Sequence, residues 1–200
     1  MNGQTYDYFG SSVSISDDYV VVGARGTNSN AGSAYNFVRS GTSWTQQHEL
    51  NVTAGQSGDY FGYSVSISGE YIVVGARGYV SSKGSAYVFV RDGTQWTHQQ
   101  QLVASDWETG DYFGYSVSIS GAYVAVGARA DSSYRGSAYV FVRSETEWNE
   151  QQKVTASDGA SSDYFGSSVS ISEDGYALVG ATGDDDDGYD SGSAYVFSLA

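Results

Sequence analysis

The chain has 200 residues, 40% of them hydrophobic, and a formal net charge of −14, which is typical of a folded domain with an acidic surface. Nine basic residues against 23 acidic ones provide no stripe able to neutralise a phosphate backbone, so nucleic acid is not an expected partner. No apolar run approaches the roughly 20 residues that span a bilayer, which excludes membrane insertion, and the lack of cysteine excludes disulfides and thiolate metal sites.

One four-residue phrase, Asp-Tyr-Phe-Gly, recurs through the chain with a period of 52 residues. It begins at Asp7, Asp59, Asp111 and Asp163. A second phrase, Gly-Ser-Ala-Tyr, begins at Gly32, Gly84, Gly136 and Gly192. Such regularity predicts structural repeats that bury their faces against one another. We expect a single repeat domain over residues 1–200, with repeats at approximately 7–58, 59–110, 111–162 and 163–200.

Each repeat contains runs that are typical of β-strands, and none has helical spacing. In the first repeat they are Ser11–Ser16, Tyr19–Ala24, Ser33–Arg39 and Trp44–Leu50. The first run places Val13 and Ile15 on one face and serines on the other, as expected for the strand nearest a crowded axis. The second is apolar on both faces and needs cover from both sides, whereas the polar fourth run belongs on the rim.

Repeated four-stranded units, with small residues inside and polar residues outside, predict the blades of an all-β propeller. Each repeat also contains Phe-Gly followed by Val-Gly-Ala, as in Phe9-Gly10 with Val22-Gly23-Ala24. This pattern resembles the FG-GAP repeat of integrin α-chain propellers and of bacterial cell-surface proteins, and the resemblance covers nearly all of the chain. It implies a propeller of four blades of about 52 residues and an extracellular or cell-surface location, with any secretion signal outside this chain.

The chain departs from that family in ways that limit what the resemblance implies. Where the family has its final proline, this chain has Arg25, Arg77, Arg129 and Thr182. The calcium loop that integrin-type repeats carry between their first two strands is reduced here to connections such as Asp17-Asp18. Because these connections are too short to wrap an ion, the family's metal ligands are not transferred to this chain.

The fourth repeat lacks the run that corresponds to Trp44–Leu50, so we expect its blade to lack an outer strand. The apolar run that follows Gly192 would then form a bare edge open to pairing. Three arrangements remain open: a closed four-bladed ring, half of a larger ring that forms a homo-oligomer through its blade faces, and a piece excised from a longer array.

The fourth repeat also contains an acidic insertion, Gly183–Asp190. Clustered carboxylates with a glycine for the turn favour a hard cation such as Ca²⁺, which takes six to eight oxygen ligands. We select Asp185, Asp187 and Asp190 as the metal ligands, with Asp184 or Asp186 as substitutes. The alternative is a solvated acidic surface loop.

Other recurring residues have structural explanations. The aspartate of each Asp-Tyr-Phe-Gly phrase is expected to bond backbone amides in a tight turn. Arg25, Arg77 and Arg129 are expected to form ion pairs with acids between blades, or otherwise a positive spot that binds an anion.

Aromatic residues expected in loops would stack on sugars or anchor a protein partner, namely Tyr63, Tyr79, Tyr115, Tyr134 and Trp107.

The sequence contains no recognisable catalytic triad, phosphate loop or zinc spacing, and we assign no catalytic residue. His48 and His98 fall at different phases of the repeat, so the repeat does not place either as a base or ligand. We expect a non-catalytic extracellular binding or adhesion module that presents loops to a protein or glycan, with assistance from calcium. The alternatives are a structural repeat module that assembles into a larger array and, less favoured, a glycan-processing hydrolase.

Overall fold

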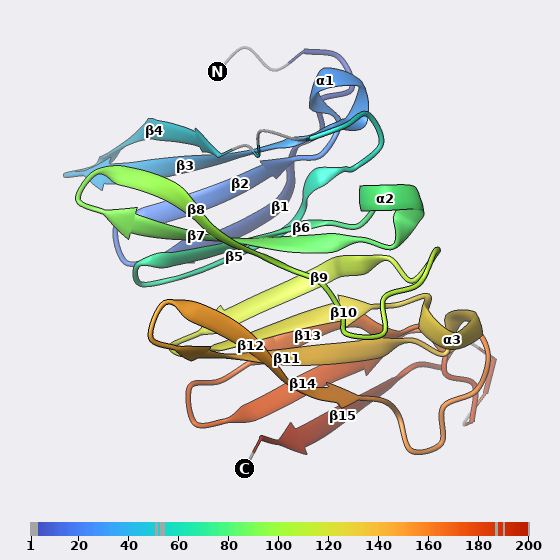
Figure 1. Cartoon of the computed structure of the whole chain (residues 1–200). Coiled ribbons are helices and arrows are strands. Elements are labelled where there is room, and N and C mark those ends of the chain that lie inside the picture. The colour runs from blue at the N-terminus through green and yellow to red at the C-terminus, as the bar shows by residue number, and fades with distance from the viewer. Residues whose placement is uncertain (1–3, 51, 53–54, 187, 190, 200) are drawn as a thin grey trace.

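The computed structural model describes residues 4–50, 52, 55–186, 188–189 and 191–199. Four antiparallel sheets follow one another along the chain, three with four strands and the last with three. We call these sheets blades 1 to 4. They are stacked in chain order, with the two termini at opposite ends of the stack, and the stack does not close into a ring (Figure 1). The prediction of an all-β propeller-like fold whose last blade lacks its outer strand is therefore confirmed.

The strands of the first blade agree with the predicted runs to within two residues, and the second blade has the same order of elements. Blade 1 contains β1 (Phe9–Ser16), β2 (Tyr19–Ala24), α1 (Thr27–Asn30), β3 (Ser33–Ser40) and β4 (Ser43–Leu50). Blade 2 contains β5 (Phe61–Ser68), β6 (Tyr71–Ala76), α2 (Tyr79–Ser82), β7 (Ser85–Asp92) and β8 (Gln95–Leu102).

The last two blades repeat the same order. Blade 3 contains β9 (Phe113–Ser120), β10 (Tyr123–Ala128), α3 (Asp131–Tyr134), β11 (Ser137–Ser144) and β12 (Glu147–Val154). Blade 4 contains β13 (Phe165–Ile171), β14 (Tyr176–Ala181) and β15 (Ser193–Ser198).

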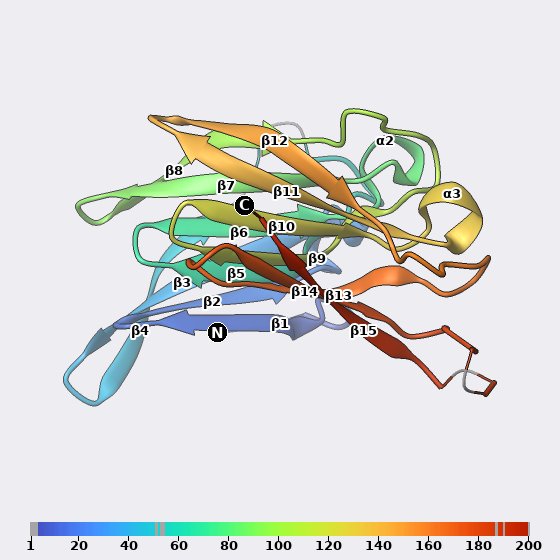
Figure 2. The same cartoon turned by 90° about the horizontal axis from the view of Figure 1, so that it is seen from below.

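The first strand of each blade is the innermost one, as predicted. Strands β1, β5, β9 and β13 pack against one another in succession, whereas the outer strands β4, β8 and β12 diverge from the stack (Figure 2). Within each blade the strands pair in chain order, with a bulge in the inner pair next to the Phe-Gly glycine. A bulge increases the local twist, which helps to turn each blade against the next.

The Phe-Gly and Val-Gly-Ala glycines allow adjacent blades to approach at the backbone. A Cβ atom placed on Gly23 would lie 2.0 Å from the carbonyl oxygen of Gly62 in the next blade. The same relation joins Gly75 to Gly114, at 2.1 Å. No side chain fits at such a distance, so the two halves of the repeat signature are the two sides of one interface between blades.

The hydrophobic core lies between blades. We call the side of a blade that packs on its predecessor the leading face, formed in blade 2 by residues such as Phe61, Val65 and Ile67. The trailing face packs on the following blade, and in blade 1 it is formed by residues such as Val21 and Leu50. All five residues are at most 6% exposed. Each blade therefore depends on a neighbour to bury its apolar faces.

Three short helical segments between the second and third strands of blades 1 to 3 were not predicted. Their backbone is left-handed: in α2, φ is +44° at Val80, +57° at Ser81 and +62° at Ser82. Such runs of side-chain-bearing residues are sterically costly. The segment is held in place because the Ser82 carbonyl accepts a 2.9 Å hydrogen bond from the Tyr112 amide of the next blade.

Among the described residues, the helices are all too short to cross a lipid bilayer.

Candidate ligand-binding face

The aspartate of each Asp-Tyr-Phe-Gly phrase fixes a tight turn, as predicted. Asp59 accepts a hydrogen bond from the Gln56 amide at 2.7 Å, and Asp111 accepts one from the Glu108 amide at 2.7 Å. Burial raises the pKa of both carboxyl groups, and the amide hydrogen bonds oppose this shift. These aspartates are therefore structural members of the turns.

The tyrosine of each phrase follows in a left-handed conformation, with φ of +54° at Tyr60 and +57° at Tyr112. This conformation places the ring beside an arginine that directly follows the second strand of a blade. The guanidinium carbon of Arg77 lies 5.1 Å from the centres of both rings, and 4.5 Å from the ring centre of Tyr63. Arg77 is thus surrounded by aromatic rings from its own blade and the next one.

Two further arginines occupy equivalent positions and extend this arrangement across the blades. Arg25 lies 4.8 Å from the ring centre of Tyr8 and 5.3 Å from that of Tyr63. Arg129 lies 4.3 Å from the ring centre of Tyr164. We call Arg25, Arg77 and Arg129, together with these tyrosines and Tyr115, the Arg–Tyr ladder.

The favoured prediction that these three arginines form ion pairs between blades is wrong. Within the described part of the chain, the ion pairs involve Arg39, Arg91 and Lys153, and none involves a ladder arginine. Each ladder arginine instead lies between aromatic rings contributed by two adjacent blades. The reason is geometric: the phrase aspartates bond backbone amides of their own turns, which leaves the tyrosine rings as the nearest partners.

The polar contacts of the ladder leave one guanidinium donor unsatisfied among the described residues. Arg129 donates a 2.7 Å hydrogen bond to the Tyr115 hydroxyl. Burial opposes ionisation of Tyr115, but hydrogen bonds from Tyr63 and Arg129 outweigh it and lower its pKa. The Nε atom of Arg77 is buried and has no hydrogen-bond partner among the residues that the structure describes. An unsatisfied guanidinium donor is costly unless a water or ligand oxygen accepts from it.

The ladder borders an open hollow at blade 1. This hollow has a volume of about 450 Å³ and is lined by Tyr8, Phe9, Gly10, Ser11, Arg25 and Tyr63. Tyr8 is 50% exposed there. At the other end of the stack the ladder stops, because Thr182 and Ser167 of blade 4 replace the arginine and the strand tyrosine. The open cationic end of the ladder therefore lies at blade 1.

Of the five aromatic residues predicted to lie in loops, Tyr63 and Tyr115 lie in strands instead, so the prediction is wrong for these two. Tyr63 and Tyr115 lie within strands β5 and β9 and belong to the ladder. Tyr79 stacks on Trp107 with 6.2 Å between ring centres, and the Trp107 indole donates to the Gly84 carbonyl at 2.9 Å. Tyr134, in α3, is 49% exposed. Of the five, Tyr134 is the one that most clearly offers a free aromatic surface.

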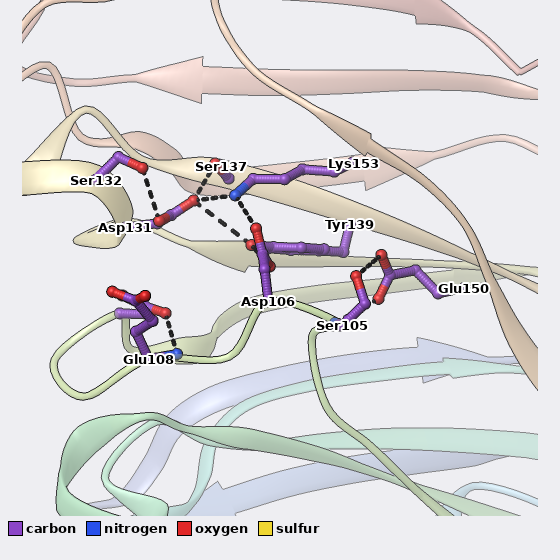
Figure 3. A network of polar contacts seen from close by, with 10 residues as sticks. Ser105, Asp106, Glu108, Asp131, Ser132, Ser137, Tyr139, Glu150 and Lys153 are labelled. Carbon is purple, nitrogen blue, oxygen red and sulfur yellow. Dashed lines mark hydrogen bonds and ion pairs between the residues drawn. The ribbon is translucent and has the colours of Figure 1, made fainter.

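A separate polar network occupies the outer part of blade 3 (Figure 3). The Lys153 ammonium lies 2.6 Å from carboxylate oxygens of both Asp106 and Asp131. Tyr139 donates to Asp106 at 2.8 Å, and Ser137 donates to Asp131 at 2.5 Å. The lysine thus lies between two carboxylates, and the hydroxyl groups of Tyr139 and Ser132 donate to the oxygens of Asp106 and Asp131 that Lys153 does not contact.

The pKa shifts in this network follow from its geometry. Burial alone would raise the pKa of Asp131, but hydrogen bonds from Lys153, Ser137 and Ser132 outweigh it and hold the pKa below its usual range. The pKa of Asp106 is lowered in the same way by Lys153 and Tyr139. Burial would lower the pKa of Lys153, but the two carboxylates outweigh burial and raise it. All three groups are charged at neutral pH, as a structural ion-pair network requires.

Blade 4 has a related arrangement without the lysine. The Tyr195 hydroxyl lies 2.8 Å from carboxylate oxygens of both Asp158 and Asp184. Asp184, considered as a substitute metal ligand, is only 3% exposed and is directed onto this tyrosine. Because blade 4 has three strands, none of its described residues occupies the place that Lys153 takes in blade 3.

The predicted metal ligands are only partly described by the structure. Asp185 is exposed, and its carbonyl accepts a hydrogen bond from the Gly188 amide at 3.0 Å. Asp187 and Asp190 lie outside the described residues. Repulsion from Asp184 raises the pKa of Asp186. Among the described residues, no group of three or more His, Cys, Asp or Glu side chains is arranged to hold a metal ion.

The two histidines have unrelated surroundings, in keeping with their different phases. His48 bonds to the side chain of Gln95 at 3.0 Å, and the ring of His98 packs against Tyr87 and Phe89. The histidines are not brought together with each other or with the ladder.

Comparison with known proteins identifies the repeat. The model of the FG-GAP repeat family matches residues 1–37, 44–89, 96–141 and 148–197. No curated protein matches the chain.

Solved structures share the fold at low sequence identity. Sqt1 of Saccharomyces cerevisiae is 13% identical, with a TM-score of 0.53, over 88% of this chain and 46% of that chain. Hydrazine synthase of Kuenenia stuttgartiensis is 14% identical, with a TM-score of 0.57, over 100% of this chain and 49% of that chain. The chain therefore spans about half the length of these structures, and the likeness concerns the fold alone.

Proposed function

This chain belongs to the FG-GAP repeat family, and from that we propose that it is a non-catalytic, extracellular binding module. Its ligand is a protein or glycan that carries carboxylate or sulfate groups, and it binds along the Arg–Tyr ladder. The observation that carries this proposal is the set of three arginines, Arg25, Arg77 and Arg129, which lie between tyrosine rings with no ion-pair partner among the described residues.

The chemistry of the ladder supports an acidic ligand. Guanidinium groups recognise carboxylates and sulfates through pairs of N–H donors, and stacking on aromatic rings leaves their edges free for such contacts. The buried Nε of Arg77 supplies one donor that still lacks an acceptor among the described residues. The ring of Tyr8, half exposed beside Arg25, supplies a flat surface for a sugar or an apolar side chain.

The net charge of the chain limits binding to acidic ligands that contact the arginines directly. With a net charge of −14, the protein repels acidic molecules in general. Binding therefore requires local contacts with the arginines and is weakened by salt, which screens exposed charges over about 8 Å at physiological ionic strength.

An array of acidic and neutral glycans and acidic peptides tests the proposal. We expect retention of acidic members by the wild type, and a loss of at least about tenfold in affinity for Arg77→Gln. Arg39→Gln is the matched control, because Arg39 pairs with Asp18 on an exposed rim away from the ladder. Equal binding by all three proteins, or no binding of acidic molecules by the wild type, would overturn the proposal.

Calcium assistance is a refinement of this proposal. The cation would be held by the acidic insertion, through Asp185, Asp187 and Asp190 as selected from the sequence. Support comes from the mutual repulsion of Asp184 and Asp186, which a bound cation relieves. Addition of Ca²⁺ is expected to raise the melting temperature of the wild type but not of Asp185→Asn/Asp187→Asn. Identical shifts in both proteins, or none in either, would rule out this ion site.

A structural role is the second candidate. Blades 1 and 4 expose apolar faces that are buried at every junction within the chain, which favours association with further blades. The two surfaces meet at Phe9, which lines both the hollow beside Arg25 and the apolar groove on blade 1.

A further inference from the structure

The three junctions between blades repeat the same contacts. The Ser14 hydroxyl accepts a hydrogen bond from the Ile67 amide of the next blade at 3.2 Å. Ser66 accepts one from the Ile119 amide at 3.1 Å, and Ser118 accepts one from the Ile171 amide at 3.1 Å. Serines on the innermost strand of each blade thus bind the innermost strand of the next.

The leading face of blade 1 has no blade to cover it within the chain. Val13 is 66% exposed and Ile15 is 64% exposed. Ile67 and Ile119, which correspond to Ile15 in blades 2 and 3, are each only 5% exposed. Trp44 is 41% exposed, against 6% for its counterpart Trp96. The face contains an apolar groove of about 350 Å³, lined by Phe9, Ile15, Val20, Val22, Phe37 and Trp44.

At the other end of the stack, the trailing face of blade 4 also exposes apolar side chains. Leu178 is 46% exposed, whereas its counterparts Val21 and Val73 are fully buried. Val196 is 70% exposed, although Val88 at the equivalent position is fully buried. Within the chain, residues at these trailing positions pack against leading-face residues of the kind that line the groove on blade 1.

The polar and steric requirements of a junction are also present at the two ends. Ser170 is exposed at the position where Ser14, Ser66 and Ser118 accept an amide from the next blade. The matching donor is the Ile15 amide of β1. Gly180 has no backbone from a following blade against it, unlike Gly23 and Gly75, so it leaves room for the carbonyl of Gly10.

We propose that two copies of this chain associate head to tail, with the trailing face of each blade 4 against the leading face of the partner's blade 1. The two junctions close an eight-bladed ring with twofold symmetry. This inference rests on the repeated junction and does not depend on the proposed ligand.

Closure has a physical reason. A leading face supplies backbone amides and a groove, whereas a trailing face supplies serine hydroxyls and projecting apolar side chains, so each face complements the other rather than itself. The junction lacks an arginine and an outer strand, since Thr182 replaces the arginine and blade 4 has three strands. The dimer is therefore weaker than the internal junctions and dissociates on dilution.

Light scattering coupled to size-exclusion chromatography tests the pairing. Over a dilution series, we expect a concentration-dependent species of twice the 21.3 kDa mass of one chain. A mass of 21.3 kDa at every concentration would overturn the proposal and assign the faces to another occupant, such as further repeats. Masses that grow without limit would also overturn it, because they indicate an open filament instead of a closed ring.

Face variants distinguish head-to-tail pairing from face-to-face pairing. Ile15→Glu alters the leading face and Leu178→Glu the trailing face, and both positions are exposed in the single chain, so both variants are expected to fold. Each alone should be monomeric, but an equimolar mixture should regain a dimer through its one unaltered junction. Val103→Glu, at a site 37% exposed outside both faces, is the matched control and should remain dimeric. If one face variant alone still dimerises, head-to-tail pairing is wrong.

Discussion

The Ser118 hydroxyl accepts a hydrogen bond from the Ile171 amide, with 3.1 Å between the two atoms, and so links the innermost strands of blades 3 and 4. The same link is found at each junction within the chain. The limited space near the axis predicts small side chains such as serine on these strands. The structure adds that they satisfy backbone donors on the inner edge of the following blade, which would otherwise be unpaired.

We expect Ser118→Ala to lower the free energy of unfolding by about 1 kcal/mol, because the Ile171 amide loses its partner. Ser144→Ala is the control, since Ser144 is an exposed residue at the end of β11. Urea unfolding followed by tryptophan fluorescence measures both. A loss in Ser118→Ala no greater than in the control would mean that water replaces the hydroxyl without cost.

We expect Gly75→Ala to destabilise the fold by at least about 3 kcal/mol. The new methyl group would lie 2.1 Å from the Gly114 carbonyl oxygen, so two blades would have to separate. Gly55→Ala is the matched control: its methyl group would lie 3.5 Å from the nearest atom, the Val52 carbonyl oxygen, and its effect should be small. The melting temperatures of the two variants should therefore differ widely. Similar melting temperatures would show that the two blades can move apart at little cost.

We expect Val80→Gly to stabilise the protein by about 0.5–1 kcal/mol. Val80 is β-branched, 48% exposed and held at φ +44°, so glycine relieves left-handed strain and loses little burial. The greater freedom of glycine in the unfolded chain offsets part of the gain. Val103→Gly, at an exposed position without left-handed backbone, should instead destabilise. A loss of stability in Val80→Gly would show that contacts of the valine side chain outweigh the strain.

The architecture could be predicted from the sequence because each strand pattern can be compared across four repeats with a period of 52 residues. A strand pattern seen once is ambiguous, but Phe9, Phe61, Phe113 and Phe165 each begin a strand at the same phase. The turn aspartates were predictable for a related reason, since their partners lie three residues away in the chain.

Contacts between blades were harder to predict. Arg77 and Tyr112 are 35 residues apart, and whether they stack depends on how far one blade turns relative to the next, which composition does not encode. The left-handed segments gave no signal, because α2 contains no glycine at its positive-φ positions. The acidic insertion occurs once, so no other repeat indicated that Asp184 would turn inward to Tyr195.

The network around Lys153 predicts a pH-dependent loss of stability in Lys153→Met. Removing the ammonium leaves Asp131, whose side chain is 11% exposed, and the half-exposed Asp106 without a cation, so we expect a loss of about 2 kcal/mol near neutral pH. Because both carboxyl groups have a lowered pKa in the folded state, their stabilisation is present above the unfolded value of about 4 and is lost as the pH falls through the folded values.

The raised pKa of Lys153 acts at the other end of the pH range: its contribution is present below about pH 10.4 and is lost as the pH rises through the folded value. The difference between wild type and Lys153→Met in urea unfolding should thus be largest between about pH 5 and 10 and shrink on both sides. Arg39→Gln breaks an exposed pair and should cost less than about 0.5 kcal/mol at any pH. A difference that does not vary with pH would indicate that Lys153 stabilises the blade through packing of its aliphatic stem and not through its charge.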